Sequence, residues 1–168
     1  RSFGGNNEKW YRDLHPNGVV PTIDDDGYIL WESNSIVRYL AAKHAPGTLW
    51  PTDPQVRGHA ERWMDWQLTT IAEGMRILFW GWTRTPHEKR DYAAMEAART
   101  ATAALWQRLD AHLATRAHVV GDQFTIGDIP VGAMCHRWHV LPFKREDLPP
   151  MPHLRAWYDR LDRKSTRL

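Results

Sequence analysis

The residues that are best suited to bind a ligand lie together in the segment 19–33, which reads VVPTIDDDGYILWES. If the Val20–Pro21 peptide bond is cis, the backbone N–H and C=O of Val20 face outward and can pair with an extended peptide. Ser33 stands at an expected helix start, where unpaired N–H groups and the helix dipole favour a carboxylate ligand. Glu32, directly before it, suits a ligand ammonium. A simpler interpretation, in which Ser33 only caps its helix, stays open.

Two short strands and a helix are expected to position these groups. The β-branched run 19–23 and the apolar run 28–31 predict two strands, joined by an acidic turn at 24–27 in which Gly27 can adopt a positive φ. The helix that follows presents one apolar face, formed by Ile36, Val37, Leu40 and Ala41. Upstream, residues 8–14 predict a short helix whose inward-facing side chains are Trp10, Tyr11 and Leu14.

The order and spacing of these motifs resemble the glutathione S-transferase family. The match comprises HPNGVVP at 15–21 and DGYILWESNSIVRYL at 26–40. The resemblance implies a cis bond before Pro21, pairing of the Val20 backbone with the cysteinyl unit of glutathione, and binding of its γ-glutamyl ammonium and carboxylate by Glu32 and Ser33. Two positions depart from the family pattern: His15, where relatives usually have asparagine, and Val19, where many have a polar or basic residue that reaches the ligand.

The resemblance also implies a fold that combines α/β and all-α parts. A partial thioredoxin-like domain occupies residues 1–44, and its first βαβ portion is missing from the chain. Residues 45–53, rich in proline and glycine, form the linker, and an all-helical domain follows at 54–161. In the family the missing portion carries the tyrosine, serine or cysteine that handles the glutathione sulfur. We therefore assign no catalytic residue to this chain and expect it to have weak activity or none.

Three capping signals organise the helical part. Asp53 followed by Pro54 predicts the start of a long helix that runs through Trp82. A capping box at 85–88, TPHE, predicts the next helix, whose face is apolar to Leu113 apart from a small polar interruption at Thr102. A second capping box, formed by Thr125 and Asp128, begins the helix that is buried at the centre of the family's helical domain. Its role is in folding.

Other side chains that could react or bind a metal are expected to serve in packing. Cys135, His136 and His139 fall short of the ligand set of a tetrahedral metal site, so we expect no metal. Nothing in the sequence marks Cys135 as an activated thiol, and we expect these residues to pack beneath the interdomain cleft. The resemblance places the acceptor site for an electrophile on the helix after the linker. Met64, Trp66 and Trp80 are candidates for that site, and periodicity leaves open which of them face it.

Composition narrows the classes of partner and compartment. The chain of 168 residues carries a net charge of +2, all of which falls in residues 162–168, and a neutral body argues against nucleic acid as a partner. A single cysteine excludes an internal disulfide, and no apolar run or leader predicts membrane insertion or secretion, so we expect a cytoplasmic protein. The tail DRKSTRL breaks the preceding helical periodicity and matches one reading frame of a common sequencing adapter. It is expected to be non-native; an ordinary basic tail is the alternative.

These observations predict a glutathione S-transferase. Its full-length parent would hold glutathione through Val20, Pro21, Glu32 and Ser33, and direct the thiolate at a small, apolar, electrophilic co-substrate, as a homodimer. Two alternatives stay open: a non-catalytic protein-assembly module of the same fold, and a glutathione-dependent isomerase or dehalogenase.

Overall fold

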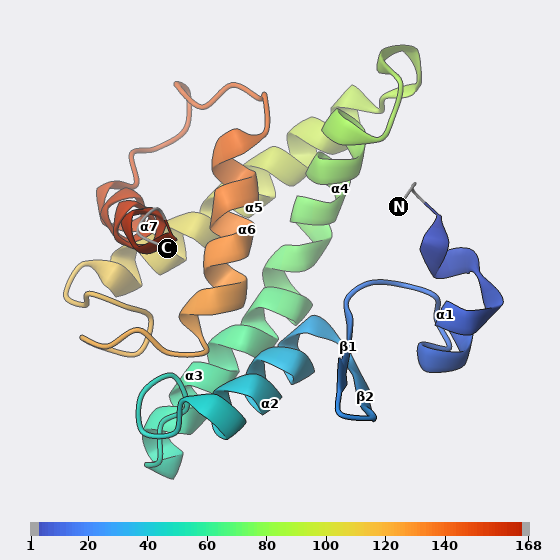
Figure 1. Cartoon of the computed structure of the whole chain (residues 1–168). Coiled ribbons are helices and arrows are strands. Elements are labelled where there is room, and N and C mark those ends of the chain that lie inside the picture. Colours follow the sequence, from blue (N-terminus) through green and yellow to red (C-terminus); the bar gives the residue numbers. More distant parts are fainter. Residues whose placement is uncertain (1–3, 166–168) are drawn as a thin grey trace. The chain divides into compact units, whose positions relative to one another are not determined.

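The structure is a computed structural model that describes residues 4–165, with side chains through Leu161. The chain forms two compact units, residues 1–50 and 51–168, and the boundary falls inside the expected linker. The first unit combines a two-stranded sheet with helices, and the described part of the second is helical (Figure 1), so the predicted fold class is confirmed. No helix in the described part is long and apolar enough to cross a bilayer.

The described part of the first unit, residues 4–50, has five elements in chain order. They are the 3-10 helix η1 (Gly5–Asn7), the helix α1 (Lys9–Leu14), the strands β1 (Thr22–Asp25) and β2 (Tyr28–Trp31), and the helix α2 (Ser33–His44). Helix α1 forms where it was expected, but its apolar side chains do not all pack inward. Trp10 is 50% exposed and Leu14 is 36% exposed, whereas Tyr11 is partly buried.

The two strands pair as an antiparallel hairpin in which Thr22 lies opposite Trp31 and Asp25 opposite Tyr28. Strand β2 has the predicted bounds, but β1 begins at Thr22 rather than Val19, because Pro21 has no N–H to donate to a ladder. Asp26 and Gly27 alone form the turn, with φ of 54° and 88°. Positive φ at both central residues is the geometry that matches the twist of a tight hairpin.

Helix α2 begins at Ser33, as predicted, and packs against both strands. Its buried residues are Asn34, Ile36 and Ala41, while Leu40, assigned to the same face, is 38% exposed. The hairpin is also tied to the helix by charge: the Asp25 carboxylate accepts hydrogen bonds of 2.5 Å from the Tyr39 hydroxyl and from the Lys43 ammonium. These bonds, that of Lys43 above all, hold the pKa of Asp25 below its ordinary value.

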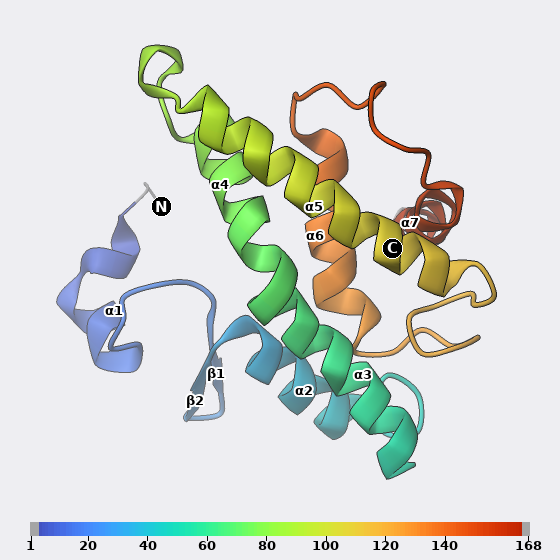
Figure 2. The same cartoon turned by 180° about the vertical axis from the view of Figure 1, so that it is seen from behind.

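The second unit is a bundle of helices. Its elements are α3 (Pro54–Trp66), the π-helical segment η2 (Gln67–Ile71), α4 (Ala72–Thr83), the 3-10 helix η3 (His87–Lys89), α5 (Tyr92–Leu113), α6 (Asp128–Val140) and α7 (Pro152–Ser165). α4 and α5 lie side by side in both views (Figure 1 and Figure 2). The largest fully buried side chains of the core cluster are Ile71, Met75, Leu78, Trp106, Leu109, Val119, Val131, Leu154 and Trp157.

The long helix predicted from Pro54 to Trp82 is present, with Asp53 accepting a hydrogen bond of 2.8 Å from the Gln55 N–H as its cap. It is interrupted by the π-helical segment η2, which periodicity did not indicate. Thr102 is buried in α5, and its hydroxyl faces Gly74 of α4, where a Cβ would lie 2.2 Å from it. This contact agrees with the expectation that a helix–helix contact tolerates a small polar residue here.

The predicted start of the next helix is wrong. Residues 86–89 hold only the short helix η3, and α5 begins at Tyr92 with Asp91 as its cap, whose carboxylate accepts from the Ala94 N–H at 2.9 Å. The Thr85 hydroxyl donates instead to the Trp80 carbonyl at 3.1 Å, at the end of α4. It therefore closes the preceding helix and is unavailable to cap the following one.

The second capping box is confirmed and is more extensive than predicted. The Thr125 N–H donates to Asp128 at 2.9 Å, and the Gly127 N–H donates to the Thr125 hydroxyl at 3.3 Å. The fully buried Asp128 carboxylate also accepts from the Val119 N–H at 3.0 Å and from the Trp157 indole N–H at 2.9 Å. One side chain thus joins the loop before α6, the start of α6 and the middle of α7.

Helix α7 extends through Ser165, into the segment 162–168 that was expected to be a non-native tail. The last three residues of that segment, 166–168, lie outside the described part of the chain.

We predict that Gly127→Ala destabilises the protein by about 1–3 kcal/mol, because overpacking a tight site forces the backbone to shift. An added Cβ would lie 2.9 Å from the Ala60 carbonyl oxygen and 3.1 Å from the Val119 side chain. Gly58→Ala is the matched control: it lies in helix α3 with nothing within 4 Å of an added Cβ. It should stabilise by roughly 0.5–1 kcal/mol. Urea unfolding of both variants tests the difference, and equal stability would contradict the close approach.

We predict that Asp128→Asn destabilises the protein by about 2–4 kcal/mol, because an amide nitrogen then faces buried N–H donors that have lost their acceptor. Asp122→Asn, at an exposed position of the preceding loop, controls for the general effect of removing one charge. Thermal unfolding should separate the two variants clearly. Similar midpoints for both would show that the hydrogen bonds to Asp128 contribute little.

Candidate functional site

The segment before β1 exposes its backbone. The Val20–Pro21 bond is cis, the geometry that the sequence resemblance implies. Val20 is 73% exposed and Val19 is 50% exposed, although both side chains are apolar. An exposed backbone next to a strand can offer its N–H and C=O to a partner chain, as an added strand does.

The Tyr11 hydroxyl anchors this segment through hydrogen bonds, a role that the sequence analysis did not predict. Its hydroxyl lies 2.7 Å from the Val19 carbonyl oxygen and 2.9 Å from the Thr22 hydroxyl oxygen. Because a phenol has one proton to donate and the Val19 carbonyl can only accept, Tyr11 donates to Val19 and accepts from Thr22. The two anchor points flank Val20 and Pro21 on either side, so the outward-facing backbone is held in place.

His15, one of the two departures from the family pattern, is a packing residue. It is buried, and its ring stacks on Trp31 with centroids 4.8 Å apart. The Asn17 N–H donates to its Nδ1 at 3.3 Å, and the Gly18 N–H donates to its carbonyl at 2.9 Å. His15 therefore shapes the turn that leads into Val19 and Val20.

The second half of the candidate site is the junction between β2 and α2. Glu32 has φ 72° and ψ 113°, an unusual conformation for a residue other than glycine. Such backbone strain is concentrated at functional sites, where the surrounding structure maintains it. Among the residues that the structure describes, neither the exposed Glu32 carboxylate nor the exposed Ser33 hydroxyl makes a hydrogen bond.

Ser33 lies at the end of α2 that carries the positive dipole. The first intrahelical hydrogen bond runs from the Ile36 N–H to the Glu32 carbonyl at 2.9 Å, so the N–H groups that precede it have no intrahelical acceptor. Such a helix start attracts a carboxylate, and the Ser33 hydroxyl adds a further donor. The carboxylate of Glu32 beside it attracts an ammonium. Together they suit the α-amino-acid end of a ligand.

The hairpin register brings both halves together. Thr22 pairs with Trp31, so the residues that precede Thr22 and the residues that follow Trp31 lie at the same end of the hairpin. Paired strands are about 4.8 Å apart, so a ligand of peptide size can contact Val20 and Ser33 at once. Of the predicted ligand residues, the structure brings together Val20, Pro21, Glu32 and Ser33.

The three residues proposed for the co-substrate do not share one exposed surface. Met64 is fully buried, Trp66 is partly buried with its ring edge-on to Trp63 at 5.2 Å, and Trp80 is 56% exposed. Trp66 and Trp80 are separated by 14 residues of continuous helix, which is about 20 Å along the axis. A single small molecule therefore cannot contact both. Trp66 lines a groove of about 480 Å³ with the polar residues Glu61, Arg62, Asp65, Thr69 and Thr70, and with Gly58.

Cys135 and its neighbouring histidines pack against α7 within the helical unit. His136 Nδ1 lies 2.8 Å from the Tyr158 hydroxyl, and the His139 ring stacks on the Tyr158 ring at 4.5 Å. Burial raises the pKa of the Cys135 thiol well above its ordinary value, which suppresses the thiolate. In the described part of the chain, no three His, Cys, Asp or Glu side chains are grouped to hold a metal ion.

Two family models match the sequence. The model described as glutathione S-transferase, N-terminal domain, matches residues 2–43, and the model described as glutathione S-transferase, C-terminal domain, matches residues 92–160. Glutathione S-transferase GstB of Escherichia coli strain K12 is 40% identical over 163 residues, which are 96% of this chain and 77% of the relative. Glutathione S-transferase D6 of Drosophila melanogaster is 25% identical over 154 residues, with 90% and 67% covered.

Solved structures agree with these matches. The theta class glutathione S-transferase from the citrus canker pathogen Xanthomonas axonopodis pv. citri, with glutathione bound, superposes with a TM-score of 0.89 at 48% identity, over 96% of this chain and 76% of that one. Glutathione transferase F2 from Populus trichocarpa has a TM-score of 0.84 at 20% identity, over 95% and 76%, and shares the fold. The chain thus spans about three quarters of the length of these relatives.

We predict that Tyr11→Phe speeds hydrogen exchange of the backbone amides around Val20 about fivefold or more, because one lost hydrogen bond is worth roughly 1 kcal/mol. Tyr28→Phe is the matched control, since Tyr28 is 51% exposed and none of the described residues bonds to its hydroxyl. Amide exchange followed by NMR or mass spectrometry measures both. Unchanged exchange in Tyr11→Phe would mean that the segment is held by its neighbours alone.

Proposed function

This chain belongs to the glutathione S-transferase family, and we propose that Val20, Pro21, Glu32 and Ser33 form its glutathione site. It is a transferase that uses glutathione as co-substrate. The theta class relative was solved with glutathione bound, which supports the same ligand here. The observation that carries the proposal is the hairpin register, which brings an outward-facing backbone and an open helix start to the same end of the sheet.

In this proposal each group binds one part of glutathione. The Val20 N–H and C=O pair with the backbone of the cysteinyl unit, held by the two hydrogen bonds of Tyr11. The Ser33 hydroxyl and the helix start hold the γ-glutamyl carboxylate, and the Glu32 carboxylate holds its ammonium. The Glu32 side chain makes no cap hydrogen bond to the start of α2, so its carboxylate remains available for the ligand.

The chemistry follows from holding the thiol in place. The thiolate lone pair forms a new S–C bond at an electrophilic carbon, and either a leaving group departs with its electron pair or the adduct takes up a proton. A lowered thiol pKa increases the thiolate fraction, and binding both reactants converts a bimolecular step into an effectively unimolecular one. None of the site residues named above is assigned to activation of the thiol.

The proposal also covers the co-substrate, the oligomeric state and the cellular compartment. We propose a small, apolar electrophile that binds along the helix formed by α3, η2 and α4, where Trp66 and Trp80 mark two separate positions. Val56 and Leu68, 38% and 48% exposed on the same run, support a second copy of the chain as partner. A cytoplasmic location is proposed with them.

The test is glutathione binding measured by calorimetry. Ser33→Ala should weaken binding about ten- to a hundredfold, because a hydrogen bond to a charged group contributes roughly 1.5–3 kcal/mol. Ser35→Ala is the matched control: two residues further on, its side chain points about 200° around the helix from that of Ser33. It should bind glutathione as the unchanged chain does.

The measurement is made on this chain and on the chain extended by the N-terminal βαβ segment that the family carries. Binding by the extended chain that Ser33→Ala weakens supports the transferase site. If the folded, extended chain ignores glutathione, the proposal fails and a protein-assembly role replaces it.

A further inference from the structure

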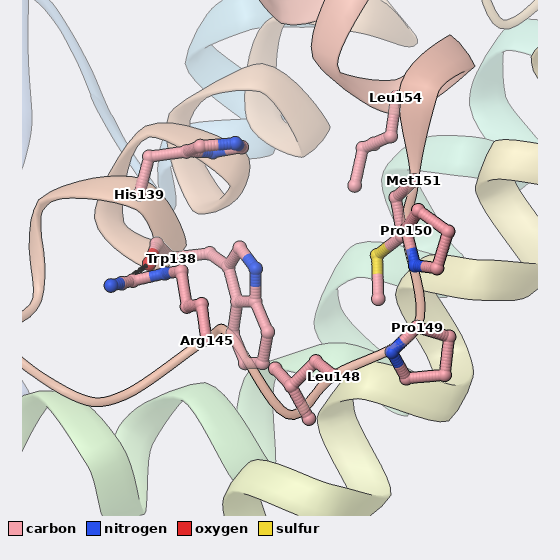
Figure 3. Close-up of a pocket in the computed structure, with 8 residues that line it drawn as sticks. All are labelled: Trp138, His139, Arg145, Leu148, Pro149, Pro150, Met151 and Leu154. Carbon is pink, nitrogen blue, oxygen red and sulfur yellow. Dashed lines mark hydrogen bonds between the residues drawn. The ribbon is translucent and has the colours of Figure 1, made fainter.

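A hollow of about 210 Å³ lies in the second unit where the end of α6, the following loop and the start of α7 meet (Figure 3). Most of its lining is apolar and comes from the loop and α7: Leu148, Pro149, Pro150, Met151 and Leu154. Trp138, His139 and Arg145 complete it. None of these residues belongs to the proposed glutathione site, and the hollow is formed within the helical unit alone.

The indole N–H of Trp138 opens into the hollow and has no acceptor among the described residues. The side chain is 3% exposed, yet no described residue accepts a hydrogen bond from its Nε1. Figure 3 shows this nitrogen on the side of the indole that faces Met151, across the hollow. Solvent reaches this nitrogen in the hollow, so a ligand that fills the hollow must supply an acceptor for the N–H to avoid losing a hydrogen bond.

His139 supplies a neutral acceptor at the rim of the same hollow. Its Nδ1 lies 2.8 Å from the Cys135 carbonyl oxygen, so this nitrogen carries the proton and donates. The lone pair is therefore on Nε2, for which the described residues provide no donor. Stacking on Tyr158 fixes the ring plane, and burial lowers the pKa of His139 and favours the neutral form.

Arg145 does not make the hollow an anion site. Its guanidinium donates to the carbonyl oxygens of Trp138, Leu141 and Phe143, the last two at 2.7 Å and 2.8 Å. These bonds satisfy the C-terminal end of α6 and fix the loop that forms the wall. Its Nε is buried without a partner and is closed off from solvent. The Arg145 guanidinium is thus occupied by backbone carbonyl groups. The hollow therefore presents one neutral donor, the Trp138 indole N–H, and one neutral acceptor, His139 Nε2.

The size of the hollow limits the ligand to one ring. A cavity of about 150 Å³ accommodates benzene, whereas drug-sized ligands occupy roughly 300–1,000 Å³. The sulfur of Met151 and the rings of Pro149 and Pro150 give the polarisable, apolar contacts that aromatic rings favour. A hydroxyl is the smallest group that can both accept from an indole N–H and donate to an imidazole nitrogen.

We propose that this hollow binds a small phenol, whose oxygen accepts from the Trp138 indole N–H, whose O–H donates to His139 Nε2, and whose ring packs against Met151. The site is separate from the proposed glutathione site, and its test does not depend on transferase activity.

The test uses the 168-residue chain labelled with ¹⁵N and titrated with p-cresol, toluene or 4-methylanisole. The indole cross-peak of Trp138 is identified by its absence from Trp138→Phe. We expect p-cresol to shift this peak and to bind about tenfold more tightly than toluene, which corresponds to about 1.4 kcal/mol. 4-Methylanisole retains the acceptor oxygen but has no O–H, so it should bind with intermediate affinity. In Trp138→Phe the advantage of p-cresol over toluene should shrink to about twofold, as the loss of one hydrogen bond requires.

A second variant keeps the test decisive if Trp138→Phe does not fold. Leu148→Trp fills the hollow from the loop and should abolish p-cresol binding, while Leu68→Trp, at a 48% exposed position of η2, should leave it unchanged. Equal affinity for p-cresol and toluene overturns the proposal. So does p-cresol binding that survives Leu148→Trp, a titration that never moves the Trp138 peak, or no binding up to the solubility of p-cresol.

Discussion

The helical unit depends on one buried carboxylate. Asp128 is fully buried, and taking a charge out of water is unfavourable unless hydrogen bonds replace its hydration. Here the N–H groups of Val119 and Thr125 and the indole N–H of Trp157 supply those bonds, at 2.9–3.0 Å. Because the three donors belong to a loop, a helix start and a second helix, these elements must assemble together for the carboxylate to be satisfied. The same residue therefore begins α6 and docks α7 against it.

The arrangement of the smaller unit depends on the pairing register of its two strands, and not on a buried charge. Hairpin pairing fixes Thr22 opposite Trp31, and a slip of one residue would turn every side chain of the strand to the other face. The tight turn at Asp26 and Gly27 permits only this alignment. Tyr11 and His15 then hold the segment that enters the hairpin, so the candidate ligand groups project from a supported backbone.

Sequence reasoning predicted the parts of the structure that depend on local signals. The apolar run of β2, the start of α2 at Ser33 and the capping box at Thr125 and Asp128 each have a signature within a few residues. The glutathione residues were proposed from a resemblance, and their roles remain a prediction. The start of α5 was predicted wrongly because Thr85 carries a capping signal, yet its hydroxyl bonds to the helix before it.

The remaining features have no local signature. The hydroxyl of Tyr11 reaches a carbonyl eight residues away, and a side-chain contact of that kind leaves no periodic trace. The position of His139 against Tyr158 depends on how α6 meets α7, which neither segment encodes alone. Burial of Met64 likewise follows from the packed bundle, since periodicity places a residue on a face without saying what covers that face.

The π-helical segment η2 has a consequence for how this helix tolerates changes in length. A π turn holds one more residue than an α turn, so η2 behaves as a single-residue insertion absorbed within an otherwise continuous helix. Each α-helical residue turns the chain by about 100°, so an extra residue in purely α-helical geometry would rotate all the side chains that follow it, whereas the wider π turn accommodates it. Met75 and Leu78 therefore keep their fully buried positions in the core although the extra residue precedes them. Related sequences should accordingly be able to lose one residue between Trp66 and Ala72, with the segment returning to α geometry and the core unchanged.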